Sequence, residues 1–341
     1  MPIEILENIP LAPFTTLKVG GPARYFATAR SEDDIARAFD FAESGGLDVF
    51  VLGGGSNILV SDDGFKGLVL HITLTGIEFN SNIKVAAGED WDRLVANCVE
   101  KGLAGFECLS GIPGSVGGTP VQNVGAYGQE VSETVVSVRC FDRESHNFIE
   151  LSNKDCGFEY RKSIFNTTHR DRFVVTSVEF AHVPDGSPKI AYKDLKGHFG
   201  THQPTLRETR DAVLKIRRAK SMVIDADDPN SKSAGSFFKN PIVPLSALSK
   251  IAGRPPIHNV PSFRLNESEA KIPAAWLIEN AGFSKGYIHG NAGISSNHSL
   301  AIINRGNASA KEIVELKDMI QKAVNDRFGI VLQPEPIFVG F

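Results

Sequence analysis

Apolar residues recur first with a helical period and then with a strand period near the start of the chain. Ser31 followed by Asp34 is a capping-box pattern that predicts the start of a helix. Its apolar positions would lie on one face of that helix: Ile35, Ala38, Phe39 and Ala42. The apolar run 49–52 predicts a strand that leads directly into the turn GGGSN at 53–57, and residues 58–60 continue as an extended apolar run.

Two further strands are expected at 68–72 and 83–87. Asp90 can cap the helix that follows them. The apolar residues of that helix share a face: Trp91, Leu94, Val95 and Cys98. From 135 to 180 the pattern is mostly that of β-strands, with VVSVRCF, the N-terminal part of HNFIEL, and FVVTSVEF as the clearest candidates.

Helical patterns return in the C-terminal half of the chain. Thr205 and Glu208 form a second capping box for a helix that runs towards Lys220, and the polar stretch 222–235 resembles a linker. A short helix is expected after Pro273, ended by Gly282. A longer helix follows the Ser309 and Glu312 box, with its apolar face inward: Ile313, Leu316, Ile320 and Val324. A last apolar strand is expected at 329–332, before the turn QPEP.

Composition limits the class of protein. A chain of 341 residues exceeds the usual size of a single core, so two or three domains are expected. The formal net charge of −4 argues against a nucleic-acid-binding protein. No apolar run is long enough to predict a membrane span, and the N-terminal residues lack a signal-peptide pattern. Because no cysteines form a CxxC pair, we expect buried thiols in a reducing cytoplasm: Cys98, Cys108, Cys140 and Cys156. The nine histidines form no metal motif, so no metal site is predicted.

Glycine is concentrated in residues 111–130, GIPGSVGGTPVQNVGAYGQE, which hold six glycines and no lysine or arginine. Such backbone freedom costs entropy on folding, and its usual return is close approach of backbone N–H groups to a phosphate. Either this segment or GGGSN alone is also consistent with a tight surface turn. GGGSN fits neither the P-loop motif, because no lysine follows at the required place, nor the dinucleotide motif, because no helix begins at its glycines. Together they predict a nucleotide diphosphate held by two loops.

Seven segments in the same order resemble the UDP-N-acetylenolpyruvoylglucosamine reductase family. They are FTTLKVGGPARYF, GGGSN, GIPGSVGGTPVQNVGAYGQE, GFEYRKSIF, SAGSFFKNP, AAWLIENAG and LQPEPIF. The resemblance implies an α+β fold with an FAD-binding part of the vanillyl-alcohol-oxidase type. Its two subdomains would be 1–70 and 71–220. A substrate domain would follow at 221–341, with its last strand and turn returning to the active site.

The activity that the resemblance implies is NADPH-dependent reduction of UDP-N-acetylglucosamine enolpyruvate to UDP-N-acetylmuramate through bound FAD, in peptidoglycan precursor synthesis. Hydride addition to the enolpyruvyl double bond drives charge into the conjugated carboxylate. The site therefore needs a cation or proton donor beside that carboxylate and an acid for the adjacent carbon.

Three residues match the catalytic groups of the family. Ser236 matches the general acid to carbon, although a serine hydroxyl needs a strong local field or a relay for this role. Arg161 matches the guanidinium that faces the carboxylate, and Glu335 matches the acid that stabilises the intermediate. Considered without the family, each has an ordinary alternative: a turn hydroxyl, a surface ion pair and a solvated turn residue.

The cofactor and substrate residues are transferred in the same way. The resemblance implies FAD contacts in the two glycine-rich loops: Gly53, Gly54, Gly55, Ser56, Asn57, Gly114, Ser115, Gly118, Asn123, Gly125 and Tyr127. Substrate contacts are implied at Tyr160, Tyr192, Lys220, Asn240 and His298. Tyr192 matches the mobile-loop tyrosine of one subgroup, and Lys220 and Asn240 match positions near the substrate diphosphate. The basic run from Lys215 to Lys220 is also typical of a solvated helix end, where Lys220 would matter most.

Two segments depart from the family pattern. Gln333 stands where the family often has a glutamate, and we expect it to face outward. The segment RRAKSMVIDADDPNSKSAGS differs from the usual basic pattern before GSFFKNP. Two other functions stay open at this point: a flavin oxidase or dehydrogenase of the same fold, and a nucleotide-sugar sensor without catalysis. We expect a monomer that binds neither nucleic acid nor membrane.

Overall fold

The computed structural model describes residues 3–252 and 260–341 and divides the chain into two compact units. The first unit comprises the residues up to Ile9, Pro22–Gly55 and Phe65–Val223. The second comprises Pro10–Gly21, Ser56–Gly64 and the residues from Ile224 to Phe341. The chain thus crosses from one unit to the other within the GGGSN turn, between Gly55 and Ser56.

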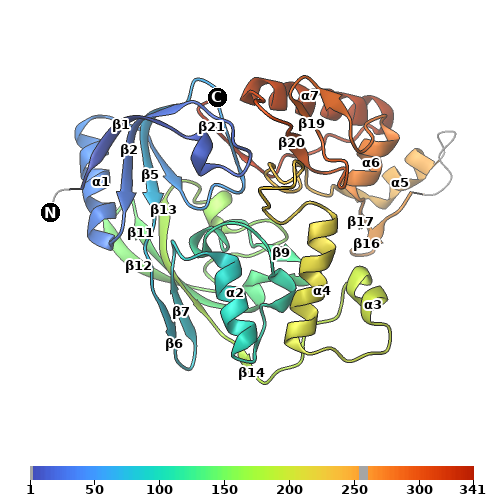
Figure 1. Ribbon diagram of the computed structural model, residues 1–341, viewed down its shortest axis with the longest axis horizontal. Coiled ribbons are helices and arrows are strands. Elements are labelled where there is room, and N and C mark those ends of the chain that lie inside the picture. The colour runs from blue at the N-terminus through green and yellow to red at the C-terminus, as the bar shows by residue number, and fades with distance from the viewer. Residues whose placement is uncertain (1–2, 253–259) are drawn as a thin grey trace. The chain divides into compact units, whose positions relative to one another are not determined.

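The first unit contains a four-stranded sheet in the order β1-β2-β5-β3 (Figure 1). Its strands are β1 (Ile5–Pro10), β2 (Pro22–Ala29), β5 (Phe65–Ile72) and β3 (Val49–Leu52). Both β2 and β3 pair with β5 in parallel, because helix α1 (Glu32–Ser44) provides the crossover between them. The Ser31 capping box that starts α1 is present as the sequence predicts.

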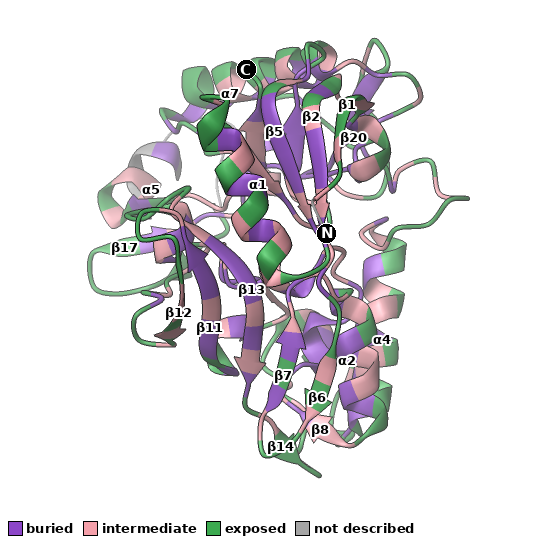
Figure 2. Ribbon diagram, turned by 90° about the vertical axis from the view of Figure 1, so that its left-hand side faces the viewer, coloured by how far each residue is buried: buried purple, intermediate pink, exposed green. Residues whose placement is uncertain are grey.

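A second sheet of the first unit has the order β12-β11-β13-β7-β6, and its strand pairs are antiparallel. Its strands are β12 (Asn147–Ser152), β11 (Val135–Asp142), β13 (Phe173–Phe180), β7 (Ile83–Ala86) and β6 (Ile77–Phe79). Phe39 of α1 stacks on Phe141 of β11 with ring centroids 5.2 Å apart, so α1 packs on both sheets. Figure 2 shows that buried positions fill β2, β5, β11 and β13.

Helices α2 (Trp91–Glu100), α3 (Lys193–Phe199) and α4 (Leu206–Ala219) complete the first unit, together with short strands. The short strands are β8 (Leu103–Ala104), β9 (Gly125–Ala126), β10 (Gln129–Glu130) and β14 (Val183–Pro184). Asp90 caps α2, and the Thr205 and Glu208 box starts α4, as predicted. Helix α4 packs beside both α2 and α3 (Figure 1), which fixes where its C-terminal Lys220 lies. Helix α3 is an addition that the hydrophobic pattern does not predict.

In its described residues, the second unit has three small sheets and three helices around its own core. One sheet pairs β4 (Ile58–Val60) with β21 (Ile337–Val339). A second has the order β15 (Ile242–Pro244), β17 (Glu269–Lys271) and β16 (Phe263–Arg264). A third has the order β18 (Ile288–His289), β19 (Ala292–Ile294) and β20 (Ile302–Asn304). The helices are α5 (Leu245–Ala252), α6 (Ala274–Asn280) and α7 (Ala310–Phe328). The predicted inward face of α7 is buried, and the Ser309 capping box is present.

The strand expected at 329–332 is wrong. Gly329 has a φ of 69° and ends α7 as a left-handed cap, and the residues that follow it form no strand. The last strand is β21, after the QPEP turn, and it pairs in parallel with β4 next to GGGSN. An apolar run predicts a strand but not the strand with which it pairs. Here the partner of β21 is β4, near the other end of the chain.

The compact units do not coincide with the predicted domain bounds, which stay a prediction. Within the span 1–70, predicted as one FAD-binding subdomain, Pro10–Gly21 and Ser56–Gly64 belong to the second unit. They do so because Leu17 and Leu59 are buried in the second core, beside Phe237 and helix α7. The division of the remaining FAD-binding part near residue 70 stays a prediction; the two sheets meet there, between Ile72 and Ile77.

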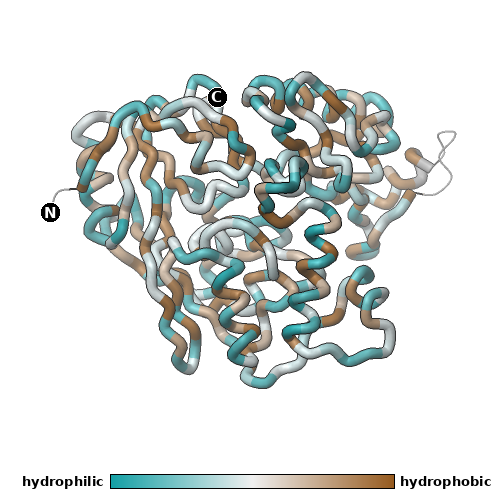
Figure 3. Tube along the Cα trace, in the orientation of Figure 1, coloured by the Kyte–Doolittle hydropathy of each residue, from teal (hydrophilic) through white to brown (hydrophobic). Residues whose placement is uncertain are grey.

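Polar and apolar residues interleave along the whole trace, as the teal and brown segments of Figure 3 show. Within residues 3–252 and 260–341, none of the helices combines the length and the apolar character needed to cross a membrane. All four cysteines are buried free thiols, as predicted. Burial raises the pKa of the Cys98 thiol to about 12, so this thiol is not a nucleophile near neutral pH.

Candidate active site

The two glycine-rich turns meet inside the first unit. The Gly54 N–H donates to Ser115 Oγ at 3.2 Å. A Cβ placed on Gly54 would lie 2.6 Å from Gly114 Cα, and one on Gly53 would lie 2.7 Å from Ser115 Oγ. Only glycine allows the two backbones to approach this closely. The predicted pairing of these loops is therefore present in the fold.

The turn at Gly114 is hydrogen-bonded to the connection between β7 and α2. The Trp91 N–H donates to the Gly114 carbonyl at 3.0 Å, and the Val116 N–H donates to the Glu89 carbonyl at 2.8 Å. A Cβ on Gly118 would meet no protein atom within 4 Å, so space remains beside this glycine. A backbone cradle with open space and no side-chain bulk fits the diphosphate of FAD. Gly53, Gly54, Gly114, Ser115 and Gly118 would hold it.

Asn123, another predicted FAD contact, is buried and has a φ of 45°. Its Nδ2 donates to Glu130 Oε2 at 2.9 Å and to the Glu159 carbonyl at 3.0 Å. Its Oδ1 accepts the Ser132 N–H at 3.1 Å. The side chain thus fastens the glycine-rich segment to its neighbours. The cofactor role of Asn123 stays a prediction, beside this structural role.

Arg161 lies against the same segment. Its backbone has a φ of 58°, and its Nη2 donates to the Gly125 carbonyl at 2.8 Å. The guanidinium also lies over the Tyr160 ring, 5.5 Å from the centroid. Arg161 is half-buried. These contacts position the guanidinium on the glycine-rich loop, and its role towards the substrate stays a prediction.

A cluster in the first unit is formed by Tyr127, Tyr192 and Lys220. The rings of Tyr127 and Tyr192 meet edge to face, with centroids 5.5 Å apart. Lys220 Nζ donates to Asp194 Oδ2 at 2.8 Å. Burial raises the pKa of Tyr127. The structure thus brings the predicted FAD contact Tyr127 together with two predicted substrate contacts.

Arg217 was grouped with the solvated helix end, and that interpretation is wrong for this residue. It is only 8% exposed, whereas Lys215 and Arg218 are exposed. Its Nε donates to the Gly111 carbonyl at 3.2 Å and its Nη2 to the Met222 carbonyl at 2.7 Å. Burial lowers the pKa of this guanidinium. Its position four residues after the buried Val213 was the signal in the sequence, because both lie on the same helical face.

Ser236, His298 and Glu335 come together in the second unit. Ser236 Oγ lies 3.5 Å from His298 Nε2. On either side of Ser236 the backbone is fixed, because the Phe237 N–H donates to the Leu300 carbonyl at 2.8 Å and the Glu335 N–H donates to the Phe237 carbonyl at 2.9 Å. Three separate segments of sequence therefore meet at one serine.

The glutamate turn is also tied to the end of GGGSN. Asn57 Nδ2 donates to the Glu335 carbonyl at 3.2 Å, and the Ile337 N–H donates to the Asn57 carbonyl at 2.9 Å. Gln333 is exposed, as the sequence comparison predicts. Asn240 has a structural contact, since its Oδ1 accepts the Ala274 N–H at the start of α6 at 2.8 Å. Its substrate role stays a prediction.

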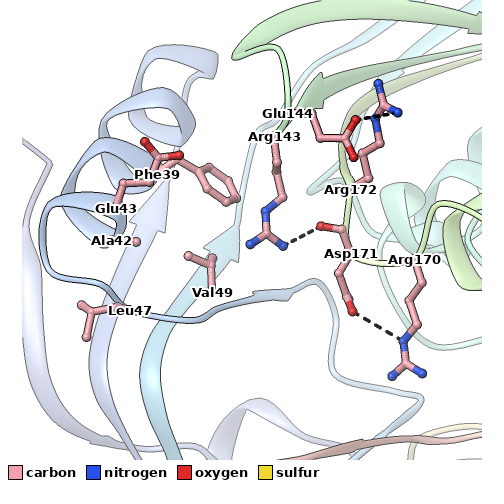
Figure 4. A pocket seen from close by; sticks show the side chains of 10 residues that line it. All are labelled: Phe39, Ala42, Glu43, Leu47, Val49, Arg143, Glu144, Arg170, Asp171 and Arg172. Carbon is pink, nitrogen blue, oxygen red and sulfur yellow. Dashed lines mark hydrogen bonds and ion pairs between the residues drawn. The ribbon is translucent and has the colours of Figure 1, made fainter.

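A cavity of about 320 Å³ in the first unit contains none of the predicted site residues (Figure 4). Its arginines are already engaged: Arg143 donates to the Asp171 carbonyl at 2.5 Å, and Arg172 pairs with Glu144 at 2.8 Å. Arg170 lies 3.6 Å from the Asp171 carboxylate. The arginines of the cavity are therefore engaged by carboxylates or by a backbone carbonyl, and the cavity has no excess positive charge to attract a phosphate. In the part of the chain that is described, no three acidic, histidine or cysteine side chains group as metal ligands.

Comparison with known proteins connects this geometry to a family. Residues 227–339 match the family described as UDP-N-acetylenolpyruvoylglucosamine reductase, C-terminal domain, and residues 23–147 match an FAD binding domain. The UDP-N-acetylenolpyruvoylglucosamine reductases of Thermobifida fusca and Streptomyces coelicolor are each 42% identical to the chain. The alignments cover 100% and 99% of the chain, and 99% and 91% of the respective relatives.

A solved structure, that of UDP-N-acetylenolpyruvylglucosamine reductase from Thermus caldophilus, matches with a TM-score of 0.67 at 26% identity. The match covers 99% of this chain and 98% of that one. The predicted FAD-binding α+β fold is thereby confirmed. The chain belongs to the UDP-N-acetylenolpyruvoylglucosamine reductase family.

Proposed function

We propose that this protein reduces UDP-N-acetylglucosamine enolpyruvate to UDP-N-acetylmuramate with NADPH and bound FAD, in the cytoplasm and as a monomer. The observation that carries the proposal is the junction of three segments that sets Ser236 beside His298 and the Glu335 turn. A protein that only bound a nucleotide sugar would have no use for a serine, a histidine and a glutamate turn brought together in this way. Bound FAD would supply the hydride-transfer chemistry between NADPH and the substrate double bond.

Ser236 donates the proton that the substrate carbon needs. A hydroxyl is a weak acid, so its proton has to be replaced by a neighbouring group as it leaves. His298 Nε2 is 3.5 Å from Ser236 Oγ and fills that place. Both residues are half-buried, so a water-excluded site can form around them when substrate binds.

Arg161 and Glu335 stabilise the charge that develops on the substrate carboxylate. Arg161 remains a cation and can bind a planar carboxylate through two N–H groups. Glu335 assists when it carries a proton, because an ionised carboxylate would repel the intermediate. Lys220 binds the nucleotide-sugar diphosphate, and Tyr192 closes over the nucleotide sugar.

Anaerobic stopped-flow on flavin-loaded protein tests this function. One equivalent of NADPH first reduces the flavin, and UDP-N-acetylglucosamine enolpyruvate is then added. We expect fast reoxidation with formation of UDP-N-acetylmuramate. Flavin that stays reduced until oxygen enters would instead indicate an oxidase, and protein that never takes up FAD would indicate a sensor.

The Ser236→Ala variant tests the role of the serine within the same experiment. Reoxidation by substrate should slow by roughly 10²- to 10⁴-fold while reduction by NADPH is little changed. Ser284→Ala, which changes an exposed serine of the same unit, is the matched control. Equal losses in both half-reactions would rule out Ser236 as the acid. Light scattering of the same preparation measures the oligomeric state.

A further inference from the structure

Lys220, the predicted diphosphate ligand, already has an anionic partner in the fold. It is the C-terminal cap of α4, and its Nζ donates to Oδ2 of Asp194 at 2.8 Å. Asp194 belongs to the first turn of α3, two residues after Tyr192. The side chains are 39% and 36% exposed, so the pair lies at the surface of the cluster and is accessible to a ligand.

The segment around Asp194 rests on the glycine-rich loop through few contacts. Tyr192 meets Tyr127 edge to face, and a Cβ on Gly128 would lie 3.2 Å from the Ala191 Cβ. Leu195 is fully buried in a small cluster with Cys108 and Val213 of the same unit. Otherwise α3 is mostly exposed. Its attachment therefore combines the aromatic contact of Tyr192, the apolar packing of Leu195 with the partly buried Ile190 and Phe199, and one ion pair.

The charges around Lys220 shift the pKa of its ammonium group. Burial by itself lowers the pKa of the Lys220 ammonium, but the hydrogen bond to Asp194 and the charges of Tyr127 and Asp194 outweigh it, so the pKa is raised. The ammonium is thus held in its charged form. A diphosphate bound to this ammonium would lie beside the Asp194 carboxylate, and like charges so close repel each other strongly. One anion therefore has to give way to the other.

We propose that Asp194 and the diphosphate of the nucleotide-sugar substrate compete for the Lys220 ammonium, so that diphosphate binding unfastens Asp194 and frees the Tyr192 segment. The inference rests on the proposed function, because it takes Lys220 as a diphosphate ligand. Asp194 is then a positioning residue that acts through Lys220. It links occupation of the diphosphate site to the position of the tyrosine that closes over the substrate.

Calorimetric titration of flavin-loaded protein with inorganic pyrophosphate tests the competition. Asp194→Asn removes the competing charge and keeps the shape, so it should bind pyrophosphate roughly two- to fivefold more tightly, the range expected for a partly exposed ion pair. Asp211→Asn, an exposed position of α4, makes the same change in net charge and should leave the affinity unchanged. Unchanged or weaker binding by Asp194→Asn overturns the proposal.

Hydrogen exchange of residues 190–199 provides a readout that affinity alone does not give. In the parent protein, pyrophosphate should accelerate exchange in this segment. In Asp194→Asn the exchange should already be fast before pyrophosphate is added, and it should not rise further. Slow exchange in Asp194→Asn, or no response of the parent protein, would show that the ion pair does not fasten the segment.

Lys220→Met separates failure of this inference from failure of the proposed function. This variant should accelerate exchange in 190–199 and weaken pyrophosphate binding, and adding Asp194→Asn to it should have no further effect. If Lys220→Met retains full pyrophosphate affinity, the substrate role of Lys220 in the proposed function is wrong. If it loses affinity but Asp194→Asn still changes binding in its background, Asp194 does not act through Lys220.

Discussion

The backbone N–H of Glu335 donates to the carbonyl of Phe237 at 2.9 Å. This bond joins the turn that carries the glutamate to the peptide that follows Ser236. An isolated bridge between Phe238 and Pro334 continues the contact. Because these are backbone contacts, the two segments stay together when the Glu335 side chain is changed, and the carboxyl group can be tested without disturbing the serine.

Glu335→Gln should lower turnover by roughly 10²-fold or more, since it removes a proton donor and keeps the shape. Reduction of the flavin by NADPH should be little changed. Gln333→Glu, an exposed position of the same turn, is the control and should leave turnover intact. The measurement is steady-state turnover alongside stopped-flow reduction. If Gln333→Glu impaired turnover as much as Glu335→Gln, the effect would belong to the charge of the turn rather than to one carboxyl group.

Gly54→Ala should weaken FAD binding. The added Cβ would lie 2.6 Å from Gly114 Cα, so the two loops would have to separate. Overpacking of this kind costs about 1–3 kcal/mol, which corresponds to roughly a five- to 150-fold loss of flavin affinity if the loops hold the cofactor. Fluorescence titration of apoprotein with FAD measures it. Gly197→Ala on α3, where a Cβ meets no atom within 4 Å, is the control, and an equal loss there would contradict the explanation.

Arg217→Gln should destabilise the first unit. The change removes a buried guanidinium that donates to the Gly111 and Met222 carbonyls. Leaving such acceptors without their donor costs about 1–3 kcal/mol in the free energy of unfolding. Urea denaturation followed by circular dichroism gives this value. The adjacent Arg218→Gln is exposed and should change the free energy of unfolding by less than about 0.5 kcal/mol; equal effects would show that burial is not the cause.

Asp142 should contribute to stability at neutral pH and lose that contribution in acid. Its hydrogen bonds from Arg172, at 2.9 and 2.8 Å, outweigh burial and hold the pKa of the carboxyl well below its usual range. Because the folded pKa lies below the unfolded value of about 3.9, the stabilisation is complete above that value and decreases as the pH falls towards the folded pKa.

Urea unfolding of Asp142→Asn and the parent protein tests this at two pH values. The parent protein should be the more stable at pH 7, and the difference should narrow at pH 3. A difference that stayed constant between pH 7 and pH 3 would show that the carboxyl acts through packing rather than through its charge.

The local elements, and the residue types that they carry, can be predicted from the sequence alone. The capping boxes at Ser31, Thr205 and Ser309 were readable because the residues that make each cap lie three positions apart. The buried faces of α1, α2 and α7 followed from the helical period. The predicted site residues followed from motifs of consecutive residues, and their roles stay predictions.

The tertiary structure decided which distant segments meet. It placed β21 beside β4, buried Arg217 against Gly111, and gave Lys220 the carboxylate of Asp194 as its partner. The helical period indicates that Arg217 is buried, but no periodic pattern names Gly111 as its partner, because each of these contacts joins residues far apart in the sequence. Hydrophobic period and capping depend on neighbours within four residues, whereas a pairing partner or a buried charge depends on how the whole core packs.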